Sequence, residues 1–196
     1  MAGRKKSVSV QEELLLCPSA KPGDWFPGIP VSAVAGIDEA GRGCLAGPVV
    51  AAAVILPEGA VIPGLADSKV LSPTRRDGLA AEIGAVALAW GLGVVWPPEI
   101  DRINILQATY EAMRQAVAQL PQEPDIFLND AVIIPGISEE KQIKIIKGDA
   151  KSVSIAAASI LAKVTRDHMM MEYDKIYPEY GFAKHKGYGT KMHNEA

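Results

Sequence analysis

The chain has 196 residues, of which 48% are hydrophobic and 22% are charged, and this composition is typical of a single domain with a well-buried core. A formal net charge of −3 gives no support by itself for nucleic-acid binding, and two distant cysteines without a CxxC or Cys/His cluster argue against a zinc site or a disulfide framework. The longest uncharged apolar run, residues 44–57, is shorter than the roughly 20 residues that cross a bilayer, so we expect a cytoplasmic protein with no membrane partner.

The N-terminal part of the chain predicts an irregular extension followed by two strands. Four prolines between residues 18 and 30 prevent a regular element, so residues 1–30 are expected to be irregular and residues 31–196 to form one domain. Residues 34–38 and 49–56 predict buried strands joined by a glycine-rich turn, because both are apolar and the second lacks helix caps.

The middle of the chain predicts a helix, a strand and a second helix. Ser72 and Pro73 mark a helix start, as N-cap and first helical residue. Residues 87–96 predict a third strand, which glycines at 91 and 93 interrupt. Apolar side chains recur every 3.6 residues in residues 103–120, which is the pattern of an amphipathic helix.

The C-terminal part predicts two more strands and a long helix. The strands cover residues 125–130 and 142–149, and the helix covers residues 150–177, where an Ala- and Ser-rich first half favours close packing on a sheet. Strands that come early and then alternate with helices predict an α/β domain with a mixed sheet.

Charge is distributed unevenly along the chain. Residues 1–140 carry 10 basic and 17 acidic side chains, whereas residues 141–193 carry 10 basic and 5 acidic ones together with all three histidines. A basic C-terminal third can mark a surface that faces a polyanion. From charge alone, a solvated helix face with scattered lysines fits equally well.

The glycine-rich segment GRGCLAG, residues 41–47, comes one residue after two adjacent acids, Asp38 and Glu39. Such a turn can present backbone N–H groups to a pyrophosphate, but only with a helix N-terminus behind the glycines. Here Pro48 and a predicted strand follow, and the spacing is GxGxxxG. The segment therefore argues against a nucleotide cofactor and fits a tight hairpin, although a hairpin does not account for Arg42 or the two acids.

Four acids stand at the ends of predicted strands: Asp38, Glu39, Asp130 and Asp149. Adjacent acids on a strand normally point to opposite faces, so Asp38 and Glu39 share a site only where the strand ends or bends. If the strands lie side by side, their ends form one site. Each of the other two acids also has a structural alternative: Asp149 could cap the helix that follows, and Asp130 could form an Asx-turn.

A cluster of four carboxylates predicts a metal site. Two unit charges about 4 Å apart repel by roughly 4 kcal/mol at an effective dielectric near 20, so the cluster must take up protons or cations. Oxygen ligands suit Mg²⁺ or Mn²⁺, and two such ions can activate a water and stabilise the leaving oxygen of a phosphodiester. The acids therefore favour phosphoryl hydrolysis.

Several long motifs in this order resemble ribonuclease HII: GIDEAGRG, DSK, KGDAKS with SIAAASILAKVTRD, and YGFAKHKGYGT. The resemblance runs from about Val34 to His193. It implies a ribonuclease H-like fold, a mixed central β-sheet flanked by helices. It also implies an endoribonuclease with a two-ion Mg²⁺ or Mn²⁺ site that cuts the RNA strand of RNA/DNA hybrids and nicks duplex DNA 5′ of embedded ribonucleotides, as in ribonucleotide excision repair. We expect it to act as a monomer.

The resemblance also implies roles for particular residues. The catalytic and metal-binding set is Asp38, Glu39, Asp130 and Asp149. Gly41, Arg42 and Gly43 would approach the ribonucleotide, their backbone reading the 2′-OH, and Tyr188 would stack under the sugar. Phosphate or sugar contacts are implied for Lys69, Asn104, Lys184 and Lys186.

Alternatives and departures from the family pattern accompany these roles. Arg42 could be a surface counter-ion, Tyr188 a half-buried aromatic and each lysine a solvated side chain, in a non-catalytic nucleic-acid-binding protein on the same fold. Cys44 and Ala131 stand where the family commonly has proline and glycine. Because the chain stops eight residues after Tyr188, where family members continue, we expect the domain to be truncated at its C-terminus.

Overall fold

The computed structural model describes residues 34–57, 60–65 and 71–196. The predicted N-terminal extension and Lys69 lie outside these residues. The strands are β1 (Val34–Ala40), β2 (Val49–Ile55), β3 (Ala89–Val95), β4 (Ile126–Asp130) and β5 (Gln142–Ile145). They form one sheet in the order β3-β2-β1-β4-β5. No helix in this described part is both long and apolar enough to cross a membrane.

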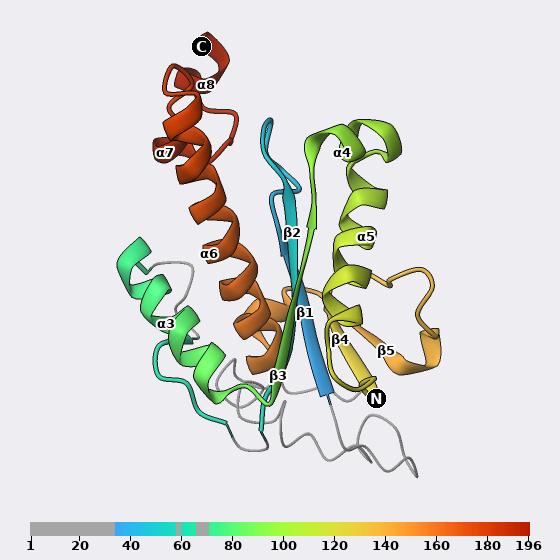
Figure 1. The fold of residues 1–196 in the computed structure, drawn as a ribbon. Helices are drawn as coiled ribbons and strands as arrows, with labels where there is room; N and C mark the ends of the chain where they lie inside the picture. The colour runs from blue at the N-terminus through green and yellow to red at the C-terminus, as the bar shows by residue number, and fades with distance from the viewer. Residues whose placement is uncertain (1–33, 58–59, 66–70) are drawn as a thin grey trace, which may run out of the picture.

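The sheet is mixed, as predicted. β1 pairs antiparallel with β2, and β2 antiparallel with β3, whereas β1 and β4 are parallel, as are β4 and β5. Figure 1 shows α3 (Pro73–Val86) and α6 (Val153–Ile176) on one side of the sheet and α5 (Ile105–Ala118) on the other. The shorter helices are α4 (Pro97–Ile103), α7 (Phe182–His185), α8 (Lys191–Glu195) and the 3₁₀ helices η2 (Glu139–Lys141) and η3 (Gly148–Ala150).

Helices on both faces explain why β2 is apolar throughout. All seven of its residues are buried. Val50, Ala52 and Val54 join the core beneath α3 and α6, while the alternate residues join the core beneath α5. A strand covered on both sides has no polar face, and its sequence therefore shows a continuous apolar run.

Glycines bring two helices into direct contact with the sheet. A Cβ on Gly36 of β1 would lie 2.1 Å from the backbone carbon of Ser154 in α6, and one on Gly93 of β3 would lie 1.8 Å from the carbonyl oxygen of Ala112 in α5. The glycines predicted to interrupt the third strand do not do so, because β3 runs unbroken from Ala89 to Val95. They let the backbone of α5 rest on the strand.

Side chains of Gln115 in α5 and of Gln119, the C-cap of α5, also reach the outer edge of β3. The Gln115 Oε1 accepts a hydrogen bond from the Val94 N–H at 3.1 Å. The Gln119 amide accepts one from the Leu92 N–H and donates one to the Leu92 carbonyl. Peptide groups on this edge are thus bonded to the helix that covers the strand.

Most predicted boundaries of helices and strands hold within a few residues, but two predictions that concern Asp149 do not. Ser72 caps α3 as predicted, accepting from the Arg75 N–H at 3.3 Å. The strand predicted over residues 142–149 ends at Ile145, so Asp149 does not close a strand but lies in η3. The alternative in which Asp149 caps the long helix is also wrong, because Ser152 is the N-cap of α6.

Candidate active site

Three of the predicted acids meet where parallel strands end. Asp38 and Glu39 are near the end of β1, and Asp130 is the last residue of β4, the parallel neighbour of β1. The Asp38 side chain is buried, with 5% of the residue exposed. The charge of Asp130 raises the pKa of both Asp38 and Glu39. The ends of β1 and β4 therefore form the acidic centre that the sequence predicts.

Asp149 reaches this edge by a different route from the predicted one. β5 lies beside β4, and the chain turns from its end into η3. The Gly148 N–H donates to the Asp130 Oδ1 at 2.7 Å. Asp149, the next residue, is 8% exposed. A hydrogen bond between neighbouring segments thus brings Asp149 next to the end of β4.

Burial and crowding raise the pKa of both β1 acids. For Asp38, burial raises the pKa well above its usual value and the charges of Glu39 and Asp130 raise it further, against hydrogen bonds from the Glu39 N–H and Ser159. For Glu39, burial raises the pKa, Arg42 opposes the rise from 3.7 Å, and Asp130 adds to it. The ionised forms of both groups are disfavoured in the folded protein.

These shifts predict a metal-free protein that loses stability as the pH rises. A carboxyl whose folded-state pKa is raised contributes stability that is complete below the unfolded pKa of about 4 and is lost as the pH passes through the folded-state pKa. Urea unfolding in EDTA between about pH 5 and pH 8 should show a falling free energy of unfolding. The fall should be smaller in Asp38→Asn, and an equal fall in both proteins would contradict this origin.

The acids suit a hard divalent cation, although they are not arranged as a finished site. Within the described residues there is no group of three or more His, Cys, Asp or Glu side chains placed to hold a metal ion. The Glu39 Oε2, however, is buried and has no hydrogen-bond partner. Such an atom is expensive to bury unless something binds it, and carboxylate oxygens are the ligands that Mg²⁺ and Mn²⁺ prefer. Asp38, Glu39, Asp130 and Asp149 are the residues that could hold such ions.

A pocket of about 390 Å³ opens beside Glu39. Its lining comes from the end of β1, the loop after it, α3, α6 and the segment before α8: Glu39, Ala40, Gly41, Arg42, Gly43, Arg76, Ser159, Ile160, Lys163 and Tyr188. Segments more than 140 residues apart in the sequence therefore share one cavity.

The two glycines around Arg42 differ in what they face. A Cβ on Gly43 would meet nothing within 4 Å, so this residue leaves open space at the pocket. Gly41 has a φ of +104°, and a Cβ there would lie 2.4 Å from the Arg166 Nε. The fold itself thus requires glycine at position 41, whereas position 43 is open to a ligand.

Tyr188 is 43% exposed and presents its ring at the pocket. The Lys163 Nζ lies 5.3 Å from the centre of that ring and forms an ion pair with Asp167 at 2.7 Å. Burial, followed by the nearby Cys44, raises the pKa of the Tyr188 hydroxyl. The aromatic residue predicted from the sequence therefore shares the pocket with Glu39 and contacts Lys163, for which the sequence predicts no role.

Three further predicted contacts that the structure describes, Asn104, Lys184 and Lys186, do not line this pocket. Asn104 accepts from the Leu106 and Gln107 N–H groups and so caps α5. Lys184 is exposed on α7, and the Lys186 ammonium donates to the Ala183 carbonyl. These roles stay predictions.

No role is predicted from the sequence for three polar residues that line the pocket, Arg76, Ser159 and Lys163, nor for Arg166, which bonds to the loop that follows β1. Three of them follow one another at intervals of four and three along α6, so they share a helix face. A polar stripe at helical spacing in an Ala-rich helix is the signal that could have pointed to Ser159 and Lys163.

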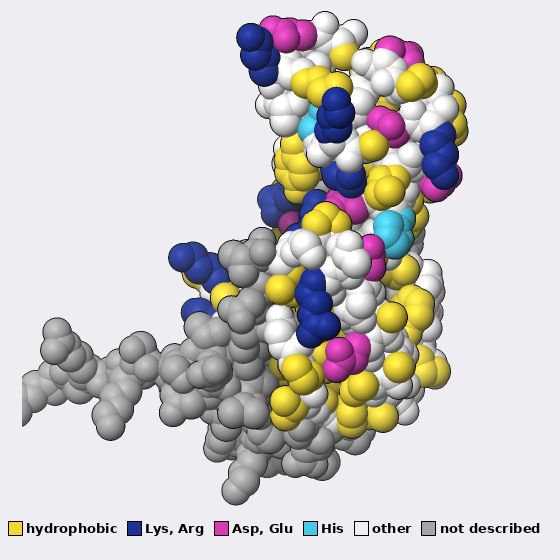
Figure 2. All heavy atoms as spheres, turned by 90° about the vertical axis from the view of Figure 1, so that its left-hand side faces the viewer, with side chains coloured by type: hydrophobic (Ala, Val, Ile, Leu, Met, Phe, Trp, Pro, Cys, Tyr) yellow, Lys and Arg dark blue, Asp and Glu magenta, His cyan; other side chains and the backbone are white. Residues whose placement is uncertain are grey.

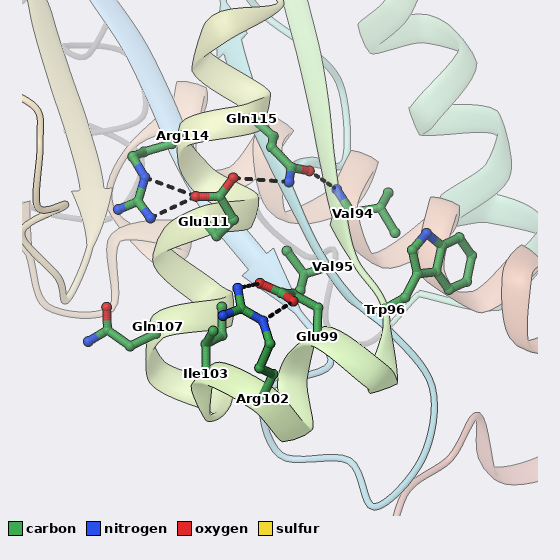
Figure 3. A pocket seen from close by; sticks show the side chains of 10 residues that line it. All are labelled: Val94, Val95, Trp96, Glu99, Arg102, Ile103, Gln107, Glu111, Arg114 and Gln115. Carbon is green, nitrogen blue, oxygen red and sulfur yellow. Dashed lines mark hydrogen bonds and ion pairs between the residues drawn. The ribbon is translucent and has the colours of Figure 1, made fainter.

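The distribution of basic side chains and a second pocket both bear on where a substrate can bind. Figure 2, which looks onto the side of α3 and α6, shows basic side chains above and below the narrow middle of the molecule with acidic ones among them. A larger pocket of about 660 Å³ lies on the α5 side. There Arg102 binds Glu99 and Arg114 binds Glu111, as Figure 3 shows, so both arginines of this pocket already have carboxylate partners.

Comparison with known proteins places these features in a family. The family model described as ribonuclease HII matches residues 35–196. Over 163 residues the chain is 58% identical to the ribonuclease HII of Clostridioides difficile, and this match covers 83% of the chain and 64% of that relative. It is 61% identical over 162 residues to the ribonuclease HII of Geobacter metallireducens, and this match covers 82% of the chain and 75% of that relative. The chain thus spans less than two thirds of the first of these relatives.

The fold agrees with the sequence match. The crystal structure of the ribonuclease H2 from Pyrococcus horikoshii superposes with a TM-score of 0.70 at 28% identity, over 84% of each chain. The predicted fold class, a mixed sheet flanked by helices in the ribonuclease H-like arrangement, is confirmed.

Proposed function

Because this chain belongs to the ribonuclease HII family, we propose that it is a metal-dependent endoribonuclease. Its substrates would be the RNA strand of RNA/DNA hybrids and duplex DNA with an embedded ribonucleotide, nicked on the 5′ side. The observation that carries the proposal is the position of Asp38, Glu39 and Asp130 at the ends of two neighbouring parallel strands, beside a pocket that Glu39 and Tyr188 line.

The catalytic acids would hold two Mg²⁺ or Mn²⁺ ions, and such ions would activate a water and stabilise the leaving oxygen. The products would carry 3′-hydroxyl and 5′-phosphate ends. The chain itself provides Asp38, Glu39, Asp130 and Asp149 as oxygen ligands. The buried and unpartnered Glu39 Oε2 supports this assignment.

Selection of the ribonucleotide would fall to residues across the pocket. Open space beside Gly43 lets backbone approach the sugar, and the half-exposed Tyr188 ring offers a surface on which the sugar can stack. Contact with the 2′-OH is what separates RNA from DNA at a given position. Arg76 and Lys163 add positive charge to the lining, which suits a phosphodiester.

A DNA duplex with one ribonucleotide and a 5′ label tests the proposal. We expect a single nick 5′ of the ribonucleotide in Mg²⁺ or Mn²⁺ and no nick in EDTA, because the acids cannot activate water without a cation. An all-DNA duplex is the matched control. Cleavage in EDTA would overturn the metal mechanism.

A non-catalytic nucleic-acid-binding protein is the second candidate, because the acids are not arranged as a finished metal site in the described part of the chain. Tight binding of the ribonucleotide duplex without any nick in either metal would favour it. The assay also tests whether a chain of this length is active. The proposal of a metal-dependent endoribonuclease also includes a cytoplasmic location, a monomeric state and a role in ribonucleotide excision.

A further inference from the structure

Arg166 of α6 is a charged residue with no exposed surface. Its guanidinium donates three hydrogen bonds to backbone carbonyls: Nε to Pro48 at 2.8 Å, Nη2 to Ala46 at 2.9 Å and Nη1 to Lys186 at 2.7 Å. The first two carbonyls belong to the loop that joins β1 to β2, and the third belongs to the segment that leads to Tyr188. One side chain therefore ties together two segments that are distant in the sequence.

The two segments also contact each other directly. The Leu45 and Ala46 N–H groups both donate to the Gly187 carbonyl, at 2.9 and 3.3 Å. Gly187 has a φ of +85°, and a Cβ there would lie 2.2 Å from the Ala46 carbonyl oxygen. The loop of residues 41–48 and residues 186–188 thus form one packed unit around the guanidinium, which we call the Arg166 clamp.

The outer surface of the Arg166 clamp carries Arg42, Gly43 and Tyr188, which line the pocket beside Glu39. Arg166 itself is not among the lining residues. Because it bonds to both segments, it fixes the separation between the glycine-rich loop on one side and the Tyr188 ring on the other.

We propose that Arg166 is a positioning residue whose three hydrogen bonds hold the glycine-rich loop and Tyr188 at the spacing that distinguishes a ribonucleotide from a deoxyribonucleotide. This inference rests on the proposed function, because it concerns the same pocket. A binding site whose loops are already ordered in the free protein loses no binding free energy to ordering them.

The chemistry of the contacts explains why the residue is arginine. A guanidinium is a planar fork of five donors, so one group can serve carbonyls in different directions. Lysine has a single nitrogen and cannot reach three carbonyls at these positions. Arg166→Lys keeps the charge but leaves buried carbonyls without a donor, which loosens the two segments.

Binding measured by fluorescence anisotropy in EDTA tests the proposal without the chemical step. The probes are two duplexes of one sequence, with and without a single ribonucleotide. We expect the wild-type protein to prefer the ribonucleotide duplex and Arg166→Lys to lose that preference by about tenfold. Both Kd values scale with the folded fraction, so their ratio is insensitive to partial unfolding.

Met170→Leu is the matched control, because Met170 is equally buried one turn further along α6 and packs on Gly47 without bonding to either segment. It should keep the wild-type ratio. If Arg166→Lys does not fold, Gly187→Ala breaks the same unit from the other side and should lower the ratio in the same way.

Hydrogen exchange gives a second readout that needs no nucleic acid. The Leu45 and Ala46 amides should exchange at least about tenfold faster in Arg166→Lys than in the wild type. Unchanged exchange, or an unchanged Kd ratio with a lowered Tm, would reduce Arg166 to a purely structural role and overturn the inference. Nicking by the wild-type protein in Mg²⁺ decides the proposed function separately, and a wild type without any preference overturns the inference as well.

Discussion

Replacing Asp38 by asparagine is expected to abolish nicking, with kcat lower by about a thousandfold or more, and at the same time to raise the Tm of the metal-free protein. The first effect follows from the proposed role of Asp38 as a metal ligand. The second follows from the raised pKa of Asp38, since the ionised carboxyl is unfavourable when buried near Glu39 and Asp130. Nicking kinetics in Mn²⁺ and thermal unfolding in EDTA measure the two effects.

Asp101→Asn is the matched control, because Asp101 is an exposed acid on α4. The same change of charge there should alter neither the nicking rate nor the Tm. An Asp38→Asn protein that nicks at the wild-type rate would remove Asp38 from the catalytic set, and one with a lowered Tm would contradict the cause given for its pKa.

The second large effect is expected at Gly36, where alanine should destabilise the protein by about 3 kcal/mol or more. The added Cβ would lie 2.1 Å from the Ser154 carbonyl carbon and 2.3 Å from the Ile155 nitrogen, both backbone atoms of α6. Since neither can rotate away, the helix must move outward. Urea unfolding at neutral pH measures the loss.

Gly78→Ala provides the comparison, because Gly78 is exposed within α3 and a Cβ there would meet nothing within 4 Å. Alanine should stabilise this helix by about 0.5 to 1 kcal/mol. Equal effects of the two substitutions would show that conformational entropy, not contact between β1 and α6, decides the role of Gly36.

Local patterns in the sequence predict most of the framework. Continuous apolar runs mark β1 and β2, and the Ser72-Pro73 pair marks the start of α3. The acids at positions 38, 39 and 130 are found because they end such runs. Information of this kind lies within a few neighbouring residues, so periodicity and capping preferences are enough to read it.

Contacts between distant segments are what the sequence does not reveal. The carbonyl partners of Arg166 stand up to 120 residues away, so its charge reads like that of any surface arginine. Asn104 looks like a free polar side chain until α5 is seen to begin directly after it. Ala131 adopts a φ of +55°, the left-handed conformation that glycine tolerates best, which accounts for the residue usual in the family at that position.

Gln115 and Gln119, which bond to β3 from α5 and its C-cap, affect how open the edge of the sheet is to another strand. An exposed strand edge is a template on which a foreign strand can add and start aggregation. Gln119 engages both the N–H and the carbonyl of Leu92, as a neighbouring peptide would, and Gln115 occupies the Val94 N–H. These two side chains therefore occupy backbone groups of the β3 edge that an added strand would need for pairing.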